Sequence, residues 1–208
     1  MPKKYTISQI IKTLKQKGYL VYTQPYQLNI VGIRSNNKVS LSFDDFIAWF
    51  YYDDNGNLQG QVVPATVDPS VQFLKNPKNT KGTAILKSGQ YVNAYKLGMH
   101  KGKYRALVQV KPVTVIRDND RDGYTTFGDN TETDLFGINI HRASRGKTNE
   151  TIIGPDSEGC QVTMNENDYN NLIAAAEKSA DLYGNNFTYT LIDERDVQKK
   201  VTTGLVVG

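Results

Sequence analysis

The sequence predicts a β-rich α+β protein, and three observations lead to this fold class. The 208 residues include 13 Tyr, 7 Phe and 1 Trp, and aromatic residues are enriched in strands. Short apolar segments are broken repeatedly by Gly, Asn and Asp, as in sheets joined by turns. Only two stretches show the apolar spacing of a helix. With 38% hydrophobic and 22% charged residues, the chain has a globular composition and the length of one domain.

The first predicted element is a short N-terminal helix. Thr6 and Gln9 have the spacing of a capping box, and Gly18 is a typical residue to end a helix. Apolar residues recur on one face of this segment, namely Ile7, Ile10, Ile11 and Leu14. We therefore predict a helix of about 12 residues.

Strands joined by tight turns are predicted to follow. The expected strands cover residues 19–22, 28–34, 46–52 and 58–64, and Asn55-Gly56 favours a hairpin turn between the last two. Pro, Asn and Gly residues over 68–82 mark a loop-rich join. We expect residues 1–81 to form a β-rich region packed on the same domain as the rest.

The second region covers residues 82–192, and a tail without periodicity covers 193–208. Its expected strands are 82–91, 95–99, 104–110, 113–117, 137–141 and 187–192, with Lys101-Gly102-Lys103 as a second hairpin turn. Asn165 is predicted to cap a helix that runs to about Ala180. The inward-facing residues of this helix are expected to be Tyr169, Leu172, Ile173 and Ala176.

Cys160 is the single cysteine of the chain and the candidate nucleophile. A reacting thiol needs a base, and imidazole is the usual partner. His141 ends an alternating segment that would deliver it from a strand, whereas His100 lies beside a turn and is expected at the surface, with a position over the active cleft as the alternative. Gly159 permits a tight turn in which the Gly159 and Cys160 N–H groups point toward a developing oxyanion. The alternative interpretation is a buried structural cysteine and a hydrogen-bonded structural histidine.

The motifs around these residues resemble one known family. Ile140-His141 is followed by the run Ser157-Glu158-Gly159-Cys160, and the L,D-transpeptidases have a strand ending in Ile-His before Ser-His-Gly-Cys. The segments GINIHRAS, GCQV and GTAILKSGQY are most similar to a divergent group of this family that tailed bacteriophages encode. The resemblance covers about residues 82–192. It departs from the family at Glu158, which replaces a histidine, and after the cysteine, where Gln161 replaces an apolar residue.

The resemblance implies a β-sandwich catalytic region and the processing of peptidoglycan stem peptides through a thioester acyl-enzyme. Cys160 would be the nucleophile and His141 the base, while Ser157 and Arg142 would bind the substrate. Peptidoglycan peptides and other phage proteins are the implied partners, and no cofactor is required. The two departures support an alternative, which is a catalytically inactive virion structural or cell-wall-binding module with the same fold.

Glu158 decides how reactive the thiol should be. An ionised carboxylate turned toward Cys160 would raise the pKa of the thiol, whereas an imidazolium at His141 would lower it. We expect Glu158 to face solvent, because a buried unpaired carboxylate is costly. Cys160 would then be a reactive thiol near neutral pH.

A second motif, Asp118 to Gly123, has the spacing D-x-D-x-D-G of a calcium loop. The candidate ligands are Asp118, Asp120, Asp122 and, at the twelfth position, Asp129. The alternative is a turn stabilised by its own Asp and Asn side chains. A bound calcium would fix the loop that precedes the His141 strand.

Charge and hydropathy bear on partners and location. The net charge of +4 comes from scattered Lys and Arg residues without a basic stripe, so nucleic acid is not an expected partner. No apolar run reaches the roughly 18 residues of a membrane span, and the first residues lack a signal-peptide core. We expect a chain made in the cytoplasm that acts at the cell wall or in a virion. A single cysteine excludes an internal disulfide.

Overall fold

The computed structural model describes residues 5–143 and 153–198. Its strands are β1 Asn29–Arg34, β2 Asp45–Tyr52, β3 Leu58–Thr66, β4 Thr83–Leu86, β5 Gly89–His100, β6 Tyr104–Gln109, β7 Val113–Asp118, β8 Thr131–Asp134, β9 Ile140–Arg142, β10 Gln161–Thr163 and β11 Phe187–Asp193. Its helices are α1 Ile7–Gln16, α2 Val71–Lys75, α3 Glu166–Tyr183 and α4 Glu194–Gln198. The predicted β-rich α+β class is confirmed.

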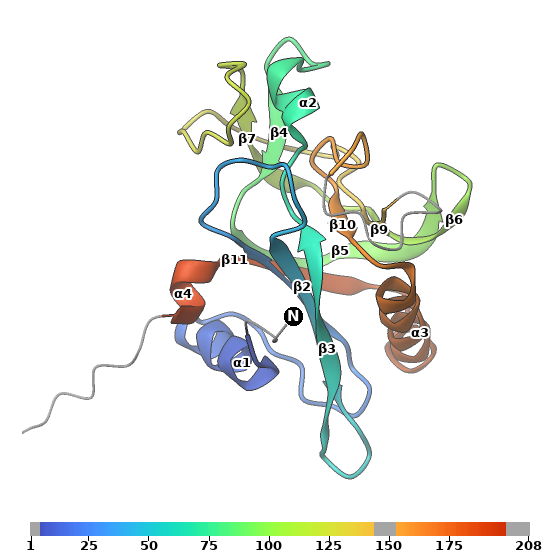
Figure 1. Ribbon diagram of the computed structural model, residues 1–208. Helices are drawn as coiled ribbons and strands as arrows, with labels where there is room; N and C mark the ends of the chain where they lie inside the picture. The colour runs from blue at the N-terminus through green and yellow to red at the C-terminus, as the bar shows by residue number, and fades with distance from the viewer. Residues whose placement is uncertain (1–4, 144–152, 199–208) are drawn as a thin grey trace, which may run out of the picture.

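Eight strands form a closed barrel in the order β1-β11-β5-β6-β9-β10-β3-β2, and β4, β7 and β8 form a separate sheet. The resemblance implied a β-sandwich, in which two sheets form separate layers. Here the strand pairing instead continues around a closed barrel, so the eight-stranded sheet has no edge strand. Two parallel pairs, β1 with β11 and β9 with β10, join segments distant in sequence. In Figure 1, α1 and α4 lie on one side of the barrel and α3 on the other.

The core explains why β1 is buried along its whole length. Successive side chains of a strand point to opposite faces. Ile30 belongs to the main core cluster together with Tyr169 of α3, whereas Val31 belongs to a second cluster with Ile10 of α1. Both faces of this strand are therefore covered, and its central residues, Ile30 to Ile33, do not alternate between apolar and polar.

The local predictions for α1 are confirmed in detail. Thr6 accepts a hydrogen bond from the Gln9 N–H, the Gln9 side chain accepts one from the Thr6 N–H, and Gly18 has a φ of 71°. The strand predicted at 19–22 is wrong. There the Tyr22 N–H donates to the Asn29 side chain instead of to a neighbouring strand.

The two regions of the chain share the barrel. β1 pairs with β11, and β3 pairs with β10, so strands from residues 1–81 lie between strands from 82–193. Within the described residues, no helix is long and apolar enough to cross a membrane. The predicted tail overlaps β11 and α4 at its start, and its residues 199–208 lie outside the described part.

Candidate functional site

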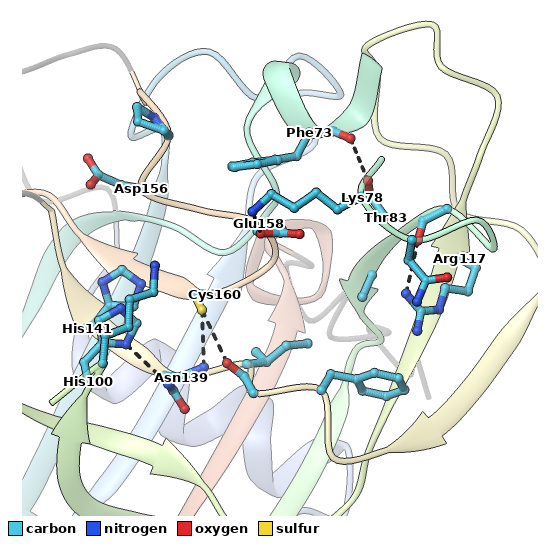
Figure 2. Close-up of a pocket in the computed structure, with 18 residues that line it drawn as sticks. Phe73, Lys78, Thr83, His100, Arg117, Asn139, His141, Asp156, Glu158 and Cys160 are labelled. Carbon is cyan, nitrogen blue, oxygen red and sulfur yellow. Dashed lines mark hydrogen bonds and ion pairs between the residues drawn. The ribbon is translucent and has the colours of Figure 1, made fainter. Parts of the chain in front are cut away.

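The parallel pairing of β9 with β10 brings the candidate nucleophile and base together. Val162 lies opposite His141 and Gln161 lies opposite Ile140, so Cys160, just before β10, reaches the same edge of the barrel. Cys160 and His141 line one cavity of about 490 Å³, which Figure 2 shows in close-up. Polar side chains from other elements complete its wall, namely Lys78, His100, Lys101, Arg117, Asn139 and Glu158.

Gly159 makes the turn into the nucleophile possible. Its φ is 121°, and a Cβ at this position would lie 2.4 Å from the Ala84 carbonyl oxygen. Both the backbone conformation and the close approach of β4 therefore require glycine. This confirms that a tight turn precedes Cys160.

Ser157 was expected to bind substrate, and its position contradicts this. Ser157 is fully buried, and its hydroxyl lies 2.8 Å from both the Asp68 and the Cys160 carbonyl oxygens. The same oxygen accepts the Gly159 N–H at 3.2 Å. Ser157 therefore stabilises the turn through hydrogen bonds to backbone groups. A buried hydroxyl with these partners is not available to a ligand.

The oxyanion prediction is changed by the same contact. The Gly159 N–H was expected to point at the substrate, but it donates to Ser157 Oγ. Within residues 5–143 and 153–198, the Cys160 N–H has no hydrogen-bond partner. One of the two predicted amides, that of Cys160, is thus available to stabilise an oxyanion.

The Cys160 thiol is oriented by backbone groups. Sγ accepts the Asn139 N–H at 3.5 Å and donates to the Gly137 carbonyl oxygen at 3.6 Å, as the dashed lines in Figure 2 mark. No hydrogen bond joins this sulfur to either histidine of the described chain. Burial raises the pKa of the Cys160 thiol, and the Asn139 N–H opposes this effect. The resting group at neutral pH is a thiol, whereas the sequence led us to expect a more reactive sulfur.

His141 is held as a neutral imidazole with a defined tautomer. Its Nδ1 lies 2.8 Å from the Arg142 carbonyl oxygen, which can only accept, so Nδ1 carries the proton and Nε2 has a free lone pair. The Tyr104 hydroxyl also donates to this carbonyl, at 3.3 Å. Burial and, second to it, the neighbouring His100 together lower the pKa of His141 to about 4. A neutral ring with Nε2 unprotonated is the form that a general base needs.

His100 is the residue of the site that sequence reasoning missed. We predicted a surface position beside a turn, but His100 is only 7% exposed and stacks on His141. The ring centroids are 4.1 Å apart and the planes differ by 23°. The hairpin turn itself is confirmed, with positive φ at Lys101 and Gly102. The sequence did contain a signal for the position of His100, namely the end of a predicted strand. β5 continues to His100, and the alternation of a strand fixes the face to which the side chain points.

A second cavity, of about 470 Å³, adjoins the first at the histidine pair. His100 and His141 line both cavities, and Lys103, Tyr104 and Arg142 line only the second. The Arg142 side chain is 6% exposed and lies 3.5 Å from Glu166. Its guanidinium also donates to the Ala143 carbonyl oxygen and lies 4.4 Å from the centroid of the Tyr104 ring. Arg142 is therefore held in place beside the second cavity.

Glu158 lines the same cavity as the thiol and pairs with a lysine. Its carboxylate lies 2.5 Å from Lys78 Nζ, and its side chain is 45% exposed. Glu158 contributes only the smallest of the effects on the pKa of Cys160. The expected solvent-facing orientation agrees with this geometry, although the partner, Lys78, is distant in sequence.

The loop that begins at Asp118 uses its carboxylates for turns. Asp120 accepts the Asp122 N–H, and Asp122 accepts the Tyr124 N–H. Asp118 accepts the Thr126 N–H through Oδ2, while its buried Oδ1 has no partner in the described structure. Burial raises the pKa of Asp118. Asp129 is exposed, and among the described residues no three His, Cys, Asp or Glu side chains are grouped as metal ligands.

No protein-family model matches the chain, and no curated protein matches it.

Proposed function

We propose that this protein is a cysteine-dependent enzyme that processes peptidoglycan stem peptides through a thioester acyl-enzyme, with the chemistry of an L,D-transpeptidase or L,D-peptidase. The observation that carries the proposal is the shared cavity of Cys160 and His141, with His141 in the tautomer of a base. The resemblance of residues 82–192 to a phage-encoded group supplies the substrate class and the phage origin. In this proposal the closed barrel is a variant of the family's β-sandwich.

The chemistry starts from a neutral thiol and a neutral imidazole. As Cys160 Sγ attacks a peptide carbonyl carbon, its proton passes to His141 Nε2, and the carbonyl oxygen becomes an oxyanion beside the Cys160 N–H. The tetrahedral intermediate collapses by breaking the C–N bond, and the leaving amine takes the proton from Nε2. The product is a thioester on Cys160 and a free amine.

The second half-reaction decides the type of enzyme. Water that attacks the thioester gives a carboxylic acid and makes the protein a peptidase, whereas a second amine gives a new peptide bond and makes it a transpeptidase. In both cases His141 takes a proton from the attacking group and returns it to the Cys160 sulfur. The two adjoining cavities that His141 lines leave room for an acyl group and for a second amine. Arg142, on the second cavity, is the candidate ligand for a substrate carboxylate.

The test uses defined muropeptides and mass spectrometry. Incubation with a purified tetrapeptide muropeptide should add an acyl group to the intact protein and release a shorter peptide or a crosslinked dimer. The Cys160→Ser variant is the control for acylation through the thiol. A wild-type protein that gains no acyl mass and releases no product under these conditions would end the proposal.

A second candidate function is a catalytically inactive virion structural or cell-wall-binding module, for which no metal or cofactor is needed. The observation that favours it is the protonated resting thiol without a hydrogen bond to His141. Binding to purified sacculi, equal in wild type and Cys160→Ala and without turnover in either, would support this module. In both candidates the protein is made in the cytoplasm and acts at the cell wall or in a virion.

A further inference from the structure

Asn139 connects the nucleophile with the histidine pair. Its backbone N–H donates to Cys160 Sγ, and its side-chain Oδ1 accepts the Gln109 N–H at 3.0 Å. This second contact fixes the amide orientation, because a backbone N–H can only donate. The Asn139 Nδ2 group therefore faces His100 Nδ1, at 3.3 Å, as a donor.

The orientation of Asn139 determines the protonation state of His100. A donor at 3.3 Å requires that His100 Nδ1 accepts, so the proton of the neutral ring is on Nε2. An imidazolium would place two N–H groups against each other. Burial lowers the pKa of His100, and Lys101 and Lys103 lower it further. The two stacked histidines thus carry their protons on opposite nitrogens, Nε2 in His100 and Nδ1 in His141.

The two contacts hold different parts of His141. The Arg142 carbonyl oxygen fixes the edge of the ring through Nδ1, and the stacked His100 ring covers one face at 4.1 Å. His100 is 7% exposed and His141 is 3% exposed, so neither ring has room to turn without moving the other. We propose that His100, held by Asn139, is a positioning residue that fixes the plane of His141 and keeps it neutral for proton transfer.

This role rests on the proposed function, in which His141 is the base. The titratable and charged groups around the pair come from several elements, and they are Lys101, Lys103, Tyr104, Arg142, Asp156 and Cys160. The His100 ring and Lys101 disfavour a positive charge on His141, whereas Asp156 favours it. A proton that His141 receives from the thiol is therefore held weakly and passes readily to the leaving amine.

Nitrogen-15 NMR of the wild-type protein tests the arrangement without any substrate. The chain has two histidines, so each single substitution assigns the remaining ring. We expect His100 to show a protonated Nε2 and His141 a protonated Nδ1, with the His141 ring neutral at pH 6. A protonated Nδ1 on His100, or a midpoint near 6.5 for either ring, would overturn the proposal.

Two variants separate the stacked ring from its hydrogen bond. His100→Ala removes the platform, and we expect the His141 midpoint to rise by one pH unit or more and kcat to fall at least about tenfold with KM within threefold. His100→Phe keeps a flat ring and should recover most of kcat. An unchanged His141 midpoint and kcat in His100→Ala would overturn the positioning role.

Asn139→Ala is the second route to the same answer if His100→Ala does not fold. It removes the donor and keeps the backbone contact to the sulfur, so His100 should titrate closer to its ordinary pKa while the far-ultraviolet spectrum stays unchanged. A His100 midpoint equal to that of wild type would count against the role of Asn139. The NMR measurements need no turnover, so a wild type with the expected tautomers and no acyl transfer would reject the proposed function alone.

Discussion

Lys78 and Glu158 form an ion pair, with Nζ 2.5 Å from Oε2, across the rim of the cavity that holds Cys160. Both side chains are well exposed, at 65% and 45%. Solvent and the lysine therefore screen the carboxylate from the thiol. Glu158 therefore has only a small effect on the pKa of Cys160.

The first prediction follows from this pair. Glu158→Gln should shift the pKa of Cys160 by less than about half a unit, because the carboxylate is exposed and already paired. The measurement is the pH dependence of Cys160 alkylation by iodoacetamide. Glu177→Gln is the matched control, since Glu177 is also exposed and paired, to Arg105. A downward shift of one unit or more in Glu158→Gln alone would show that the carboxylate acts on the thiol.

The nucleophile gives the second prediction. Cys160→Ala should lower muropeptide turnover by about three orders of magnitude or more, because no other thiol exists in the chain. The melting temperature should stay within a few degrees, since Cys160 is only partly buried. Turnover is followed by chromatography of the released peptides. Retained turnover in this variant would exclude the proposed mechanism.

The pH dependence of alkylation gives the third prediction. The pKa of Cys160 is raised and that of His141 is lowered to about 4, so between pH 5 and 8 the pair consists mainly of a thiol and a neutral imidazole. The alkylation rate should therefore rise about tenfold per pH unit from pH 6 to 8, as the thiolate fraction grows. His141→Gln should leave this profile within about threefold and still reduce turnover about 10²-fold or more, because the base acts only in the transition state. A rate plateau between pH 5 and 7 that His141→Gln removes would instead reveal a thiolate–imidazolium pair.

The turn before the nucleophile gives the fourth prediction. Gly159→Ala places a methyl group 2.4 Å from the Ala84 carbonyl oxygen at a φ of 121°, so it should destabilise the fold by about 2 kcal/mol or more. Urea unfolding followed by circular dichroism measures the change. Gly128→Ala is the control, because a Cβ there meets nothing within 4 Å and the backbone is not left-handed. Equal stability of the two variants would show that the turn can relax.

The loop from Asp118 to Asp129 gives the fifth prediction. We propose that calcium binds this loop through Asp118, whose buried Oδ1 has no partner in the described structure, and that the Asp120 and Asp122 carboxylates leave their turn hydrogen bonds to join it. Millimolar calcium should then raise the melting temperature above that in EDTA, by mass action on the folded state. Asp118→Asn should lose the response. Superimposable melting curves of the wild type in calcium and EDTA would contradict calcium binding by this loop.

Elements stabilised by neighbouring residues were predictable from sequence. The capping box of α1, the cap of α3 at Asn165 and the hairpin at Lys101-Gly102 all appear where the pattern places them. In each case the stabilising contacts join residues a few positions apart, so the sequence contains the whole interaction. The predicted strand at 19–22 failed because a side chain, Asn29, takes the hydrogen bond that a neighbouring strand would have made.

The sequence by itself determined the fold class, the turn at Gly159 and the pairing of Cys160 with His141 as candidates, because residue chemistry and spacing are local properties. Only the tertiary structure decided that the ladder closes into a barrel, since β1 must find β11 at the far end of the chain. It also decided that Ser157 is buried, that Glu158 meets Lys78 and that His100 covers His141. Each of these contacts joins segments that no periodicity connects, and packing alone determines which of them meet.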